Sequence, residues 1–123
     1  MAFVKNTTPT ALAGVLVTST SLGPTSEDNV TGNSSGKIYQ IAIDNSANPN
    51  STAYVKIADA SSATPASTAA NWIFPAKGGQ KITYIMDTGA PYTAGISIWC
   101  TSTPSTGSQG SLNNVVSFSL LAS

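Results

Sequence analysis

Residues 94–101 read AGISIWCT, and this short stretch decides the fold class. Its side chains divide by strict alternation between two sets: Ile96, Ile98 and Cys100 against Ser97, Trp99 and Thr101. A period of two is that of a β-strand, whose successive side chains point to opposite faces. We therefore predict a strand with its aliphatic side chains inward and with Trp99 exposed on an outer sheet face, where a large aromatic residue marks a contact.

Segments of the same character lie throughout the chain. Six more have the composition or alternation of short strands: residues 12–20, 37–44, 53–58, 71–74, 80–86 and 112–121. The turns Asn48-Pro49-Asn50 and Gly78-Gly79 predict two β-hairpins, which join 37–44 to 53–58 and 71–74 to 80–86. Three polar segments without apolar periodicity are predicted to be loops: residues 25–36, 59–70 and 101–111.

Composition supports an all-β fold in one domain. Serine and threonine occupy 34 of 123 positions, and these short hydroxyl residues suit strands and turns better than helices. A chain of this length has one hydrophobic core. We expect a single antiparallel β-sandwich or jelly roll of seven to eight strands over residues 11–123. Residues 1–10, polar and with a proline, are predicted to be an N-terminal arm that orders on a neighbouring molecule.

The charge of the chain excludes some partners. Only 8% of the residues are charged, the net charge is zero, and the five cations are scattered lysines without any arginine. Nucleic acid binding needs clustered cations, so we expect neither nucleic acid nor a membrane surface as a partner. A neutral surface has little self-repulsion and favours assembly.

Catalytic and metal-binding residues are sparse. Histidine is absent, which removes the commonest general base and zinc ligand, and no signature spacing of a Ser–Lys dyad or a nucleotide-binding loop occurs. The turn with Asp44, Asn45, Asn48 and Asn50 has oxygen ligands suited to calcium, but a single carboxylate favours a hydrogen-bonded turn. Cys100 has no disulfide partner and is predicted to be buried. We predict no enzyme activity, no cofactor and no metal.

Contacts with other proteins are the remaining possibility. The aromatic residues Trp72, Trp99, Tyr54, Tyr84 and Tyr92 are candidates for a sugar-stacking platform or, as is more usual in alternating strands, for core and interface positions. Our candidate partner contacts are exposed apolar residues and an acidic pair in the first long loop: Phe3, Val4, Glu27, Asp28, Trp99, Leu112 and Leu121.

Residues 53–102 resemble a pattern found in small structural proteins of tailed-phage virions. The pattern has a strand such as AYVKI (53–57), a polar Ala/Thr/Pro loop, a turn of the form FPxxGG (74–79) and a strand such as AGISI (94–98). The resemblance implies a capsid decoration (cement) protein, commonly a homotrimer, that contacts the major capsid protein or other virion proteins. A head-fibre or tail component and a carbohydrate-binding adhesin module are the alternatives. Residues 1–10 lack the apolar stretch of a signal peptide, so we expect synthesis in the host cytoplasm. The resemblance implies a location on the capsid surface of the virion.

Overall fold

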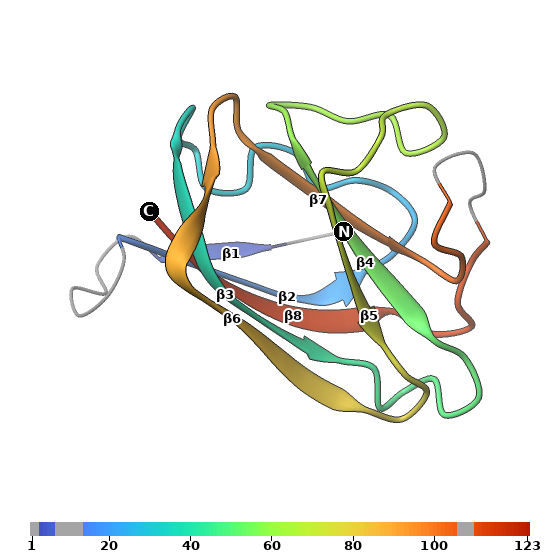
Figure 1. Cartoon of the computed structure of the whole chain (residues 1–123). Coiled ribbons are helices and arrows are strands. Elements are labelled where there is room, and N and C mark those ends of the chain that lie inside the picture. Colours follow the sequence, from blue (N-terminus) through green and yellow to red (C-terminus); the bar gives the residue numbers. More distant parts are fainter. Residues whose placement is uncertain (1–2, 7–13, 106–109) are drawn as a thin grey trace.

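The computed structural model describes residues 3–6, 14–105 and 110–123 (Figure 1). Within these residues the chain forms eight strands and no helix. The strands are β1 (Val4–Asn6), β2 (Val15–Leu22), β3 (Gly36–Asp44), β4 (Ala53–Asp59), β5 (Trp72–Ala76), β6 (Lys81–Tyr92), β7 (Ile96–Thr101) and β8 (Val116–Ala122). A large sheet has the order β1-β2-β8-β3-β6 and a small sheet the order β5-β4-β7. The predicted all-β fold is confirmed.

The pairing of the strands is that of a rolled antiparallel ribbon. β4 pairs with β5, β3 with β6, and β2 with β8, while Glu27, between β2 and β3, bridges to Ile98 of β7. The first half of the chain therefore runs alongside the second half in reverse order. Additional pairing of β3 with β8 and of β4 with β7 joins neighbouring turns of this ribbon into two facing sheets. This is the winding of a jelly roll.

Both predicted hairpins are wrong, because the two turns connect different sheets. β3 lies in the large sheet and β4 in the small one, and β5 and β6 are separated in the same way. Asn45 explains the first crossover. Its side chain is fully buried, and Nδ2 donates to the carbonyl oxygens of Ser51, Ala76 and Lys77 at 2.9, 3.0 and 3.2 Å. One amide thus ties the β3–β4 connection to the β5–β6 connection.

The core lies between the two sheets and follows the alternation of the strands. In β8, residues 116, 118, 120 and 122 are buried and the intervening ones are partly exposed. Residues 96, 98 and 100 of β7 point into the same core. Buried apolar side chains of this kind stabilise a fold by about 1.5–3 kcal/mol each relative to exposure. β7 differs from the other strands because all six of its residues are buried, so both of its faces are covered.

The predicted N-terminal arm is partly a strand. Val4–Asn6 forms β1, which pairs with β2 at the edge of the large sheet, whereas residues 1–2 and 7–13 lie outside the described residues. The start of the predicted sandwich domain at residue 11 also lies outside them. In the described part of the chain, no helix is long and apolar enough to cross a membrane.

Candidate interaction surface

The outer face of the large sheet carries two uncharged rows of side chains. Paired residues point to the same face, so the strand register fixes each row. The first row contains Ile85, Gln40, Leu121, Leu16 and Asn6, on β6, β3, β8, β2 and β1 in turn. The second row contains Thr83, Ala42, Ser119, Thr18 and Val4. Aliphatic residues are spaced across these two uncharged rows, and the charged residues Lys81 and Asp44 lie in the next row of the same face. Such a mixture of apolar and uncharged polar side chains is a feature of protein-binding surfaces.

Ile85 is the most exposed large apolar residue of the described chain, at 69%. It lies opposite Gln40, where a register shift between Ile38 and Gln40 interrupts β3. Beside it, an open pocket of 240 Å³ is lined by residues that include Tyr39, Met86 and Leu121. Ile85 is not among the contacts predicted from the sequence, although its alternation with the inward-facing Tyr84 and Met86 could have revealed it.

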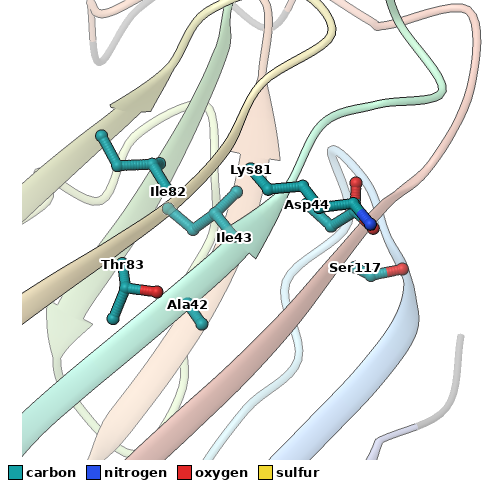
Figure 2. A pocket seen from close by; sticks show the side chains of 7 residues that line it. All are labelled: Ala42, Ile43, Asp44, Lys81, Ile82, Thr83 and Ser117. Carbon is teal, nitrogen blue, oxygen red and sulfur yellow. The ribbon is translucent and has the colours of Figure 1, made fainter.

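A second open pocket lies where this face meets the end of the sheet (Figure 2), and its volume is 310 Å³. Lys81 and Asp44 lie side by side at one end, with Nζ 3.8 Å from Oδ2, and Ser117 is next to them. Hydrogen bonds from Ser46 lower the pKa of Asp44, and the charge of Lys81 adds to this effect. Since the Lys81 side chain is 74% exposed, it is a solvated cation at the edge of the apolar face.

Trp99 is buried, so the expectation that it lies exposed on an outer sheet face is wrong. It points away from the core, as the alternation predicts, but it is only 1% exposed. Its strand neighbour Lys56 is equally buried and donates from Nζ to the carbonyl oxygen of Ser105 at 2.8 Å. Segment 102–105 thus comes over this face of the small sheet. Desolvation lowers the pKa of Lys56.

Glu27 is also buried rather than exposed in a surface loop. It is 5% exposed, and its backbone exchanges hydrogen bonds of 2.8 and 2.9 Å with Ile98. Neither carboxyl oxygen has a hydrogen-bond partner among the described residues, and burial raises the pKa of Glu27. Asp28 is exposed and accepts a hydrogen bond from the amide of Ala63 at 3.2 Å. The backbone of Glu27 thus joins this loop to β7, and the Asp28 carboxylate joins it to the connection between β4 and β5.

The other predicted contacts have mixed positions. Phe3 and Val4 are 37% and 64% exposed, and Leu121 lies in the middle of the outer face of the large sheet. Leu112, in contrast, is partly buried against the core. Whether any of these residues contacts a partner stays a prediction.

The aromatic residues do not form a stacking platform. Tyr92 is buried like Trp99, and its hydroxyl donates to the carbonyl oxygen of Ser123 at 2.6 Å. Phe74 and Tyr84 contact each other at 5.2 Å between ring centroids, inside the sandwich, and Trp72 packs against the same core. Tyr92, Phe74, Tyr84 and Trp72 therefore pack against the core. Tyr54 lies on the outer face of the small sheet, as Trp99 does, and is partly exposed.

The oxygen-rich turn after β3 is hydrogen-bonded within itself. Asn45 Oδ1 accepts from Asn48 Nδ2 at 3.0 Å, and Asn48 Oδ1 accepts from the amide of Asn114 at 2.9 Å. The amide of Ser46 donates to Asp44 at 2.9 Å, which makes an Asx turn. Among the residues that the structure describes, no three His, Cys, Asp or Glu side chains come together as a metal site would require.

Comparisons of the chain with family models, with curated proteins and with solved structures found no match.

Proposed function

We propose that this chain is a structural protein of a tailed-phage virion, a decoration (cement) protein that binds to the outside of the head shell. The observation that carries the proposal is the outer face of the large sheet, where Ile85, Leu121 and Leu16 share an uncharged row. An aliphatic row between polar neighbours suits docking onto a protein surface. The resemblance of residues 53–102 to small phage virion proteins supplies the identity of the partner, the major capsid protein.

A stabilising role follows from how such a module acts on a lattice. Each copy buries one modest face, and many copies on a repeating shell add their contributions. The chain is suited to this role because hydrogen bonds of Asn45 and Asn48 join the connections at one end of the two sheets, which favours a preformed docking face. Preorganised surfaces lose less entropy on binding.

The adhesin alternative loses its expected anchor. Binding of a sugar ring by stacking needs an exposed aromatic face, and both Trp99 and Tyr92 are 1% exposed. A head-fibre or tail location uses the same docking chemistry and differs from the head location in its partner.

The proposal is tested by deleting the gene from the genome that encodes it and purifying the particles. We expect wild-type particles to contain the chain in many copies by mass spectrometry. Particles without it should release DNA at a lower temperature, and added purified protein should restore the wild-type release temperature. Absence of the chain from wild-type heads, or identical release curves with and without it, would contradict the proposal. Its presence in tails alone would favour the tail component.

A further inference from the structure

Strand β6 forms one edge of the large sheet, and none of the described strands pairs with its outer side. β6 is the last strand in the sheet order and, among the described strands, is hydrogen-bonded to β3 alone (Figure 1). Its other edge therefore presents backbone N–H and C=O groups that can pair with another extended chain. The first seven residues, Lys81–Asp87, come before Gly89, which has a positive φ of 81°, and before Pro91. They form the part of the edge that is suited to pairing.

The remaining sheet edges are short or covered. β1 has three residues, and β5 has five, one of them Pro75, which lacks the N–H needed to pair. The free side of β7 is occupied by the loop between β2 and β3, because Glu27 pairs with Ile98 and the amide of Val30 donates to the carbonyl oxygen of Ile96 at 2.9 Å. Natural proteins protect sheet edges in these ways. β6 is therefore the long edge left without such protection in the described part of the chain.

The sequence of this edge, KITYIMD, is complementary to itself when two copies run antiparallel. With Tyr84 facing Tyr84 at a two-fold axis, Lys81 of each copy faces Asp87 of the other. In the same register Ile82 faces Met86, and Thr83 faces Ile85. This register also keeps the two faces of the sheet continuous. The exposed residues 81, 83, 85 and 87 of one copy pair with exposed residues of the other, and the inward residues 82, 84 and 86 pair with inward residues. Opposite charges directly across two strands stabilise the pair.

We propose that two copies of this chain associate through antiparallel pairing of Lys81–Asp87 of β6 about a two-fold axis at Tyr84. The two five-stranded sheets become one continuous sheet. Lys81, whose Nζ lies 3.8 Å from Asp44 in its own chain, then lies between that carboxylate and Asp87 of the second copy. The contact is isologous, so each copy uses its free edge once and the assembly closes as a dimer.

A second copy is the partner that this edge fits best. Residues 81–87 carry a lysine at one end and an aspartate at the other, so two antiparallel copies bring opposite charges together at both ends. The proposal goes beyond the virion function. It concerns the isolated protein, so it can fail while shell binding holds, and the reverse is also possible. The trimer that the family resemblance implies makes a different prediction for the same measurement.

Sedimentation velocity from 5 µM to 1 mM, at about 0.05 M salt, tests the pairing. We expect a concentration-dependent monomer–dimer equilibrium. D87K places two lysines opposite each other at both ends of the register, and K81D does the same with two aspartates. Each should raise the dimer dissociation constant about tenfold or more. K77D is the matched control, because Lys77 is an exposed turn residue outside β6, and it should leave the constant unchanged.

An equimolar mixture of K81D and D87K should recover the dimer as a heterodimer, because both ends of the register then regain opposite charges. Circular dichroism and thermal melts check that each variant is folded. As a second measurement, a mixture of K81C and D87C should cross-link on oxidation much more than either variant alone. A monomer at 1 mM, a trimer, a dimer unaffected by D87K, or a mixture that neither reassociates nor cross-links would overturn the proposal.

Discussion

Replacing Asn45 with alanine should destabilise the jelly roll more than any other single change in its turns. The two hydrogens of the buried Asn45 amide serve three carbonyl oxygens, and its Oδ1 accepts from Asn48. Loss of the two N–H donors costs about 1 kcal/mol each, and the one N–H of Asn48 that loses its acceptor adds about 1 kcal/mol. The expected loss of unfolding free energy is therefore about 3 kcal/mol, or about 10 °C in Tm for a domain of this size.

Urea denaturation followed by tryptophan fluorescence measures this loss. N50A is the matched control, because Asn50 is an exposed amide in the same connection, and its replacement should cost less than about 0.5 kcal/mol. A cost below about 1 kcal/mol for N45A, or equal costs for the two variants, would refute the idea that this amide holds the two crossovers together.

Three further results are expected. Because burial raises the pKa of Glu27 above its ordinary 4.5, the folded chain binds this proton more tightly than the unfolded chain, so Tm should rise as the pH falls from 7 towards 4.5. E27Q should lack this rise in Tm, and parallel Tm–pH curves for E27Q and the wild type would contradict the role of Glu27. Burial raises the pKa of Cys100 to about 12, so a thiol reagent at pH 8 should label it only after unfolding; rapid labelling of the native protein would show that the site is open. D59A should loosen the β6–β7 connection, because Asp59 accepts hydrogen bonds from the amides of Thr93 and Ala94 at 2.9 and 2.8 Å; unchanged amide exchange there would count against this role.

The strands were predictable from sequence because the alternation of apolar and polar residues is visible within each short segment. Alternation shows which face of a strand is apolar, but both sheets of a sandwich bury one face, so it does not show to which sheet a strand belongs. The hairpin predictions failed for this reason. The crossover depends on hydrogen bonds from Asn45 to Ala76 and Lys77, which are more than thirty residues away along the chain.

The candidate surface was harder to predict than the fold. The alternation predicts the correct face of β7 for Trp99, but the segment 102–105 covers that face, and no local sequence pattern reveals such a cover. The sequence predicts an exposed loop at Glu27, because a single bridge to Ile98 is too short to leave an alternating pattern. Ile85 could have been found, since it follows Tyr84 on an alternating strand. Leu121 was named from sequence, and the structure places it in the middle of the outer face.

The central claim is that the outer face of the large sheet docks onto the virion shell, and co-sedimentation tests it most directly. Purified protein is mixed with shells that lack it, and the bound amount is measured up to saturation. We expect saturable binding that L121K weakens at least tenfold, because its charge would be buried in the docked face. I73K, with a lysine on the outer face of the small sheet instead, should bind like the wild type. Absence of binding, or equal binding by L121K and the wild type, would contradict the claim.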